Sequence, residues 1–451
     1  MHTVKKRLNA LNQSNAATLG GGTALTAMIR FVSTSILTRL LAPEAFAIAV
    51  VINSIVTSLE LMSDFGIKPF VIRDKEEMNE TTGDVIWTIQ MLRGCFLSAM
   101  MWIWAPGLAQ AFANPDTVGY IRVAAIIPLV NGLRSLGEPL AARAGVQRVN
   151  ERILVLRAFF SSLGTIAFAI WLRNPWAIVL GITLAAFTNA AIDWIVFRRH
   201  WRLKFRFDRG IFLRVLNFSK YLFFSSILTL VISQVDKLVV ARNFSLETVG
   251  LYGMAMTLLL IMTTMITSYT RSVFFPDVAQ AIRDERLDRK EMRKAMGIAP
   301  LVFLYLSGGA IGGGQIFFQI IFDDRYLFGG VIFSVIAMRG IVLTVSDLAA
   351  NTEVAFGNTR HTLEMNIIIM AWIAVTIPLL MNAYGVLGLA AAVGSINLLP
   401  ALIGTYRVYR RGLFVPSYYV LGALMVGAGV FTGVAGTWLI KVAAAALSIP
   451  L

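Results

Sequence analysis

Long apolar runs separated by short polar segments follow one another along nearly the whole chain. Each run holds roughly 20 residues, which is enough for an α-helix to cross a hydrocarbon core about 30 Å thick. The pattern predicts an all-α polytopic membrane protein of 12–14 transmembrane helices, with thirteen as the best count. The predicted spans are residues 18–42, 44–65, 84–111, 118–140, 152–172, 176–197, 215–240, 247–272, 295–321, 328–352, 363–382, 385–406 and 417–440.

The distribution of lysine and arginine supports this map. With a cytoplasmic N-terminus, the inward segments carry most of these residues, and the outward segments carry only Arg173, Arg242, Arg325 and Lys441. A missed or invented helix would disturb the alternation downstream, and no disturbance is seen over the first twelve spans. The same rule accounts for the net charge of +15 without a nucleic-acid partner.

Composition leaves little room for a soluble domain. The chain is 57% hydrophobic and 14% charged, whereas a soluble domain has about 25% charged residues. Its single cysteine, Cys95, can form neither an intrachain disulfide nor a thiolate metal cluster. The first 17 residues are polar, and the apolar run after them is too long for a signal peptide, so we expect a retained first helix.

The most basic segment, residues 198–214, separates the first six predicted helices from the next six. We therefore predict an N-terminal six-helix bundle at residues 1–205, a C-terminal six-helix bundle at 206–412 and an additional transmembrane helix within 413–451. Faint similarity between the first hairpins of the two halves, together with an even helix number, favours parallel repeats. Residues 417–451 could hold one long helix or a tight hairpin.

No Walker, HExxH or GxSxG sequence is present, and the three histidines are scattered over the terminus and loops. We therefore expect no cofactor, no metal site and no enzyme activity. Without a nucleotide site, any transport would be powered by an ion gradient, by coupled flux or by the substrate gradient. The glycine-rich run at residues 308–314 lies in mid-membrane, where close helix packing or a hinge is the expected role.

Ionisable residues inside the spans are the informative ones, because each costs roughly 2.5–3.5 kcal/mol at a helix centre and so needs a partner, water or a function. Arg30 and Arg339 lie near the midplane and Arg93 lies about a third of the way along its span. This cationic excess suits an anion with forked oxygens, such as a phosphate or pyrophosphate. Closer to the cytoplasmic surface, an inter-helix ion-pair network is expected among Glu60, Asp64, Arg134, Glu138 and Arg157.

Short motifs then reveal a resemblance. They are TRLLAPEAF at 38–46, SDFGI at 63–67 with VIR at 71–73, QMLRG at 90–94, FSK at 218–220 with SSI at 225–227, QVDK at 234–237, VGLY at 249–252 and FP at 275–276. Because these motifs occur in this order, the chain resembles the polysaccharide-transporter branch of the multidrug/oligosaccharidyl-lipid/polysaccharide exporter superfamily. That branch includes the O-antigen and exopolysaccharide repeat-unit flippases of the Wzx type, and the match covers residues from about 15 to 412.

The resemblance implies two six-helix bundles around a central cavity, which opens alternately to each side of the bacterial inner membrane. It implies a polyprenyl-pyrophosphate-linked oligosaccharide moved from the cytoplasmic to the periplasmic leaflet for O-antigen or exopolysaccharide assembly. A polysaccharide polymerase and a chain-length regulator are candidate partners. Chosen by depth and placement, the candidate substrate-binding residues are Arg30, Arg93, Arg271, Arg339 and Lys220. The candidate gating or coupling residues are Asp64, Asp236, Asp347 and Arg39.

Three alternatives remain at this point. An ion-coupled multidrug antiporter of the same fold would be expected to have an acid-dominated N-terminal cavity. A peptidoglycan-precursor flippase would complement a depletion strain. A membrane-embedded glycosyltransferase or polymerase would need a large periplasmic loop, and no predicted outward loop is long enough.

Overall fold

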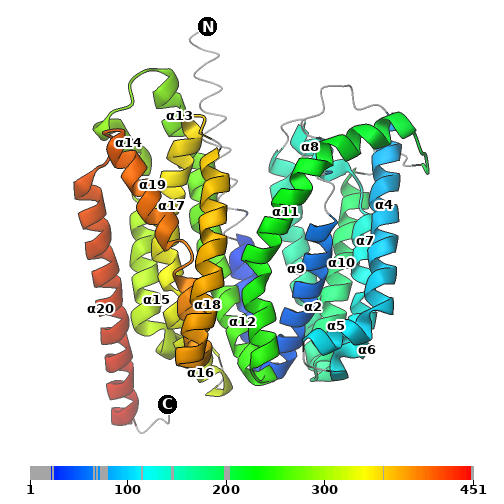
Figure 1. The fold of residues 1–451 in the computed structure, drawn as a ribbon. Coiled ribbons are helices and arrows are strands. Elements are labelled where there is room, and N and C mark those ends of the chain that lie inside the picture. The colour runs from blue at the N-terminus through cyan, green and yellow to red at the C-terminus, as the bar shows by residue number, and fades with distance from the viewer. Residues whose placement is uncertain are drawn as a thin grey trace. The chain divides into compact units, whose positions relative to one another are not determined.

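The computed structural model describes residues 22, 25–63, 67, 70–71, 80–112, 115–143, 147–197, 204–322, 324–358 and 360–447. Every regular element in this part of the chain is a helix (Figure 1). Nine helical segments among the described residues are long and apolar enough to cross a membrane. Helices suit a bilayer because they satisfy their backbone polar groups internally. The all-α polytopic class is confirmed; the count of thirteen stays a prediction.

The chain divides into two compact units, residues 1–250 and 251–451. The first contains helical residues 25–40 and α2 (Pro43–Met62), α4 (Glu80–Ile103), α5 (Ala105–Ala111), η1 (Pro115–Thr117), α6 (Val118–Ala124), α7 (Ile126–Gly132), α8 (Gly137–Arg143), α9 (Gln147–Leu172), α10 (Trp176–Phe197) and α11 (Arg209–Asn243). α12 (Leu246–Tyr269) begins just before the division. The second unit continues with η2 (Thr270–Phe274), α13 (Phe275–Arg283), α14 (Arg289–Met296), α15 (Ala299–Ile321), η3 (Asp324–Tyr326), α16 (Leu327–Ile336), α17 (Met338–Ala355), α18 (Arg360–Gly394), α19 (Leu398–Arg410) and α20 (Pro416–Leu447).

The boundary between the two compact units, after residue 250, lies later in the chain than the predicted boundary at residue 205. The reason is that α11 packs against α2 and α4 of the first unit. Immediately after α11, the chain stays close to the start of α2: a Cβ on Gly250 would lie 1.9 Å from the Pro43 carbonyl oxygen. The proposed six-helix bundles remain a prediction, since the basic segment used to separate them lies partly outside the described residues.

Two predicted spans are each interrupted near the middle. The span at 118–140 steps at Ala125 between α6 and α7, and the span at 328–352 steps at Ala337 between α16 and α17. In each case a 3₁₀ turn, η1 or η3, comes directly before the first short helix. The same order of turn, short helix, step and second helix therefore occurs once in each unit, and the parallel arrangement of the two halves stays a prediction.

The long element α18 is a hairpin of two helices. Gly385 has φ 59° and ψ −136°, a backbone conformation that side chains with a Cβ rarely adopt. The arms meet so closely that a Cβ on Gly388 would lie 1.8 Å from the Leu380 carbonyl oxygen. The turn at Gly385 coincides with the start of the predicted span at 385–406, directly after the span at 363–382.

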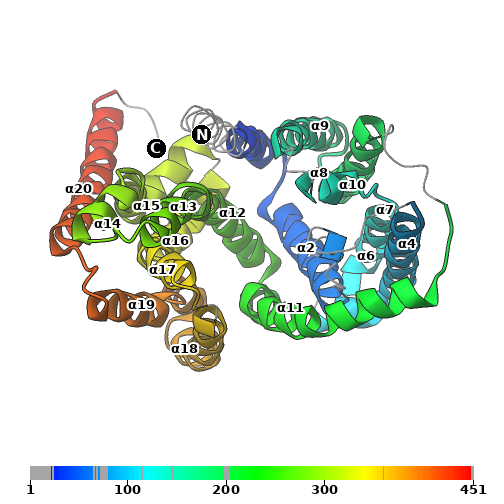
Figure 2. The same ribbon diagram turned by 90° about the horizontal axis from the view of Figure 1, so that it is seen from above.

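The C-terminal helix α20 packs along α15 through glycines. A Cβ on Gly312 would lie 2.4 Å from the Val430 carbonyl oxygen, and one on Gly433 would lie 2.7 Å from that of Gly309. Figures 1 and 2 show α20 beside α15 at the edge of its unit. Close helix packing is therefore confirmed as the role of the glycine-rich run, and residues 416–447 form one helix instead of a hairpin.

Candidate functional site

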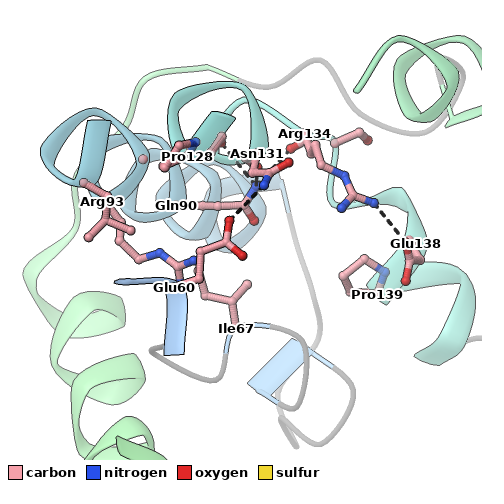
Figure 3. Close-up of a pocket in the computed structure, with 13 residues that line it drawn as sticks. Glu60, Ile67, Gln90, Arg93, Pro128, Asn131, Arg134, Glu138 and Pro139 are labelled. Atoms are coloured by element: carbon pink, nitrogen blue, oxygen red, sulfur yellow. Dashed lines mark hydrogen bonds and ion pairs between the residues drawn. The ribbon is translucent and has the colours of Figure 1, made fainter. Parts of the chain in front are cut away.

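A polar cavity of about 420 Å³ lies inside the first unit, where α2, α4 and α7 approach one another (Figure 3). Its polar lining comes chiefly from Glu60, Gln90, Arg93, Asn131 and Arg134. A charged and amide-rich lining is costly within a membrane-spanning bundle unless water or a polar ligand enters it. The cavity is therefore the first candidate site.

Glycines create the space for these side chains to meet. Gly94 of α4 and Gly132 of α7 both line the cavity, and the helices touch there through backbone atoms. Gln90 lies one turn before Gly94 and reaches across the contact. Its Nε2 is 3.2 Å from the carbonyl oxygens of Asn131, Gly132 and Arg134, at the end of α7. A single amide thus reaches three carbonyl oxygens at this helix end, of which that of Asn131 also accepts from the Arg134 backbone N–H at 3.3 Å.

Arg93 presents a guanidinium to this cavity from the middle of α4. Its Nη1 lies 3.4 Å from the carbonyl oxygen of Ser63, which is the C-cap residue of α2. Asn131 of α7 donates from Nδ2 to Glu60 Oε1 at 2.8 Å, and Glu60 lies in the last turn of α2, at the same helix end as Ser63. The cavity lining therefore combines two cations, Arg93 and Arg134, two acids, Glu60 and Glu138, and the amides of Gln90 and Asn131. Such a set can bind phosphate oxygens and hydroxyl groups.

An ion-pair network lies beside the cavity. Arg134 Nε is 2.7 Å from Asp193 Oδ2 and its Nη2 is 3.2 Å from Glu138 Oε2. Arg157 completes the set, with Nη1 3.0 Å from Glu138 Oε2 and Nη2 bonded to Asp193 Oδ1. Asp193 is fully buried. With two cations and two anions, the network is neutral. Because Glu138, Arg157 and Asp193 lie on α8, α9 and α10, its ion pairs join these three helices.

The expected network is thus confirmed for three of its residues, Arg134, Glu138 and Arg157, and its fourth partner is Asp193. Glu60 does not join it, because Asn131 holds that carboxylate instead. Asp64 lies outside the described residues. Elsewhere in the first unit, the backbone N–H of Lys204 donates to Asp84 Oδ1 of α4 at 3.0 Å.

In the second unit, a π-helical turn brings two of the predicted residues near each other. The turn is η2, and it carries Arg271 as well as Thr270, whose hydroxyl donates to Asp347 of α17. Arg271 is exposed, and its charge acts on the Asp347 carboxylate. Because π-helical turns open a local gap in the backbone ladder and often mark functional positions, this cluster is the second candidate site.

The other predicted residues have varied positions. Arg30 and Arg39 are exposed on the first helix, and Arg339 is half-buried in the first turn of α17, directly after the step at Ala337. Asp236 is buried, with one carboxylate oxygen 3.6 Å from Lys237 Nζ. The side chain of Lys220 lies outside the described part of α11. Arg30 and Arg93 belong to one unit and Arg271 and Arg339 to the other, so a shared cavity for the four stays a prediction.

The polar residues Gln90, Asn131 and Thr270 were missed as site residues because none of them is charged. Gln90 carried a signal, since it begins the QMLRG motif that also holds Arg93. Within the described residues, no group of three or more His, Cys, Asp or Glu side chains could hold a metal ion.

Comparisons with known proteins agree on a membrane transport fold. A protein family described as "Polysaccharide biosynthesis protein" matches residues 36–327. The teichuronic acid biosynthesis protein TuaB of Bacillus subtilis (strain 168) is 20% identical over 66% of this chain and 62% of its own length. The succinoglycan biosynthesis transport protein ExoT of Rhizobium meliloti (strain 1021) is 22% identical over 70% of this chain and 63% of its own length. This chain thus covers less than two thirds of either relative.

A longer match is found with the lipopolysaccharide biosynthesis protein WzxC of Escherichia coli (strain K12), which is 19% identical over 88% of this chain and 82% of its own length. Among solved structures, the lipid II flippase MurJ in an inward closed conformation has a TM-score of 0.72 at 10% identity, covering 94% of this chain and 99% of that chain. An inward-facing multidrug resistance MATE family transporter of the MOP superfamily has a TM-score of 0.63 at 11% identity, covering 90% and 95%. At these identities the structures show the fold alone. Because the family match spans well over half of the sequence, the chain belongs to the polysaccharide biosynthesis protein family.

Proposed function

We propose that this protein is a flippase that moves a polyprenyl-pyrophosphate-linked oligosaccharide from the cytoplasmic to the periplasmic leaflet of the bacterial inner membrane. Family membership and relatives named for succinoglycan and lipopolysaccharide biosynthesis support a saccharide substrate. The fold of a lipid II flippase supports movement of a lipid-linked headgroup. The alternation of basic segments supports a cytoplasmic N-terminus.

One observation carries the proposal: a guanidinium, that of Arg93, faces a cavity of about 420 Å³ inside a membrane-spanning bundle. Burying a cation there is favourable only with compensating polar groups or an anionic ligand. A pyrophosphate supplies two groups of oxygens that match the forked geometry of guanidinium. The neighbouring amides of Gln90 and Asn131 suit the hydroxyl groups of a sugar.

In the proposed cycle, Arg93 draws the pyrophosphate from the cytoplasmic leaflet while the polyprenyl chain stays in lipid. Arg30, Arg271, Arg339 and Lys220 are proposed to add to this attraction. Neutralising the cations lowers the cost of closing the cytoplasmic side, and the outer side then opens. Asp64, Asp236, Asp347 and Arg39 are proposed for gating or coupling, and Asp347 has the clearest support, because the Thr270 hydroxyl fixes it beside Arg271.

The test uses a deletion strain complemented with wild-type or Arg93→Ala protein. We expect deletion to leave lipid-linked repeat units on the cytoplasmic leaflet, and Arg93→Ala to restore little surface polysaccharide at normal protein level. Arg152→Ala is the matched control, because Arg152 is exposed on α9 and does not line the cavity. Wild-type polysaccharide from Arg93→Ala would remove this residue from the mechanism, and unchanged leaflet distribution after deletion would reject the flippase.

A multidrug antiporter is the second candidate, favoured by the MATE-like fold and by Glu60 in the cavity wall. It predicts drug resistance on overexpression that is lost with Glu60→Gln and retained with Arg93→Ala. The flippase predicts no such resistance. A third candidate, a peptidoglycan-precursor flippase, rests on the likeness to MurJ and predicts rescue of a strain depleted of that activity.

A further inference from the structure

A second hollow on the first unit has a different character from the polar cavity. It is an open groove of about 800 Å³ lined by the C-terminal half of α4 and by the α6–α7 step. Cys95 and Leu129 lie toward one end, and Trp102, Ile103 and Arg122 toward the other. From Cys95 to Trp102 the helix rises about 10 Å, so the groove can accept a sizeable part of an extended hydrocarbon chain.

The few hydroxyl groups in this groove are already engaged by the backbone. Ser98 of α4 donates its hydroxyl to the Ala125 carbonyl oxygen, which the step between α6 and α7 exposes. Thr183 of α10 donates to the Val179 carbonyl oxygen at 2.8 Å. Neither hydroxyl proton is left for a ligand, so the lining offers an occupant mainly hydrocarbon contact and no amide or carboxylate. This lining favours an acyl chain over a sugar, which needs polar partners for several hydroxyl groups.

The single charge in the groove is Arg122. Its guanidinium carbon lies 5.2 Å from the ring centroid of Trp102, within the range of a cation–π contact. Both side chains are exposed. Nearby, Tyr120 packs edge-on against Trp176, with ring centroids 4.6 Å apart. Tryptophan and tyrosine collect at the headgroup level of a bilayer, where a guanidinium beside them can meet lipid phosphates.

We propose that this groove binds one glycerophospholipid, with an acyl chain along α4 and α7 and the phosphate against Arg122. The groove has one cation, Arg122, at the end of an apolar surface. A glycerophospholipid has one phosphate at the end of its acyl chains, so the two are complementary. The groove lacks the further polar groups that a pyrophosphate and sugars would require. This favours a phospholipid of the bilayer over the proposed lipid-linked oligosaccharide. The assignment is independent of the proposed flippase activity and concerns binding only.

The experiment measures lipid retained by the purified full-length protein in detergent, using native mass spectrometry. The probes are palmitoyl-oleoyl phosphatidylglycerol and a diacylglycerol with the same chains but no phosphate. We expect the wild-type chain to retain one phosphatidylglycerol and little diacylglycerol. Arg122→Ala should lower retention about fivefold, because one cation near a phosphate-bearing surface contributes roughly 1 kcal/mol. Arg122→Lys should keep most of it.

Two further variants separate the groove from surface charge in general. Ala99→Phe places a ring in the groove and should also lower retention, whereas Arg242→Ala removes an exposed cation of α11 and should change nothing. Equal retention by Arg122→Ala and wild type would overturn the proposal, as would equal retention of the two probes by the wild-type chain. Transport of the saccharide is not the readout, so failure of the proposed function leaves this result unaffected.

Discussion

Gly94 and Gly132 meet at the crossing of α4 and α7, where a Cβ on Gly94 would lie 2.9 Å from the Gly132 Cα and 2.6 Å from the Pro128 carbonyl oxygen. Contact this close is possible only without side chains on both helices. The same two glycines also line the polar cavity, together with Arg93 and Asn131. Helix packing and the proposed binding site therefore depend on the same pair of residues.

The first prediction is that Gly94→Ala lowers the stability of the first unit. The added methyl group would meet backbone atoms that cannot rotate away, and overpacking of this kind costs about 1–3 kcal/mol. Thermal unfolding of the detergent-purified protein measures the effect. Gly107→Ala in α5 is the matched control, because no atom lies within 4 Å of its added Cβ. Equal melting temperatures for the two variants would contradict the close crossing.

The second prediction concerns the buried carboxylate of Asp193. Asp193→Asn leaves Arg134 and Arg157 with Glu138 as their only acid in the network. Breaking a buried ion pair from one side costs about 3–5 kcal/mol, so we expect a large fall in the midpoint of thermal unfolding. Asp193→Asn combined with Arg157→Gln restores neutrality and should recover part of the loss. Asp116→Asn, on the exposed turn η1, should have no effect. A double variant no more stable than Asp193→Asn would show that charge balance is not the cause.

Sequence patterns predicted the parts of this fold that depend on local composition. Apolar length predicted the all-α polytopic class, and the glycine-rich run predicted a close helix contact because such a contact needs small residues. The step at Ala125 also had a signal. Pro128 lacks an N–H, and its ring crowds the carbonyl group four residues earlier, which interrupts a helix there. The step at Ala337 has no proline nearby and depends on tertiary packing, which no single-chain pattern reveals.

The candidate site was harder to predict for the same reason. Depth in a span located Arg93, but the partner of Glu60 is the neutral Asn131, 71 positions away in the sequence. A hydrogen bond between a neutral and a charged side chain cannot be found by looking for opposite charges in the sequence. Arg30 and Arg339 were assigned a shared cavity from depth alone, and depth does not determine the direction in which a helix face points.

The third prediction addresses the attachment of α20. Gly433→Val would push a branched side chain against Gly309 and Gly313, where an added Cβ would already lie 2.7 Å from backbone atoms. We expect α20 to separate from α15. A bifunctional thiol crosslinker that spans Tyr305→Cys and Thr432→Cys reports the contact, since the native side chains meet across it with their hydroxyl groups 3.1 Å apart; Cys95→Ser removes the native thiol. Crosslinking should fall with Gly433→Val and persist with Gly427→Val, whose Cβ meets nothing within 4 Å. Undiminished crosslinking in Gly433→Val would refute the glycine contact.

The last prediction tests whether the hydrogen bond from Thr270 to Asp347 is needed for transport. Thr270→Val keeps the shape of the side chain but removes the donor, so the Asp347 carboxylate would lose the group that fixes it beside Arg271. We expect Thr270→Val to reduce surface polysaccharide at least tenfold in the complemented deletion strain, with protein level unchanged, and Thr270→Ser to restore it because serine keeps the hydroxyl. Asp347→Asn should resemble Thr270→Val if the charge itself is required.

The matched control for this bond is Thr264→Val on the same helix. The Thr264 hydroxyl is exposed and donates to the Leu260 carbonyl oxygen four residues earlier, a bond internal to α12 that an undisturbed helix tolerates losing. Comparable polysaccharide from the valine variants at 264 and 270 would mean that the bond to Asp347 has no part in transport. Loss in Thr270→Val and Asp347→Asn, with retention in Thr264→Val and Thr270→Ser, would instead tie the π-helical turn to the step that couples or gates movement of the headgroup.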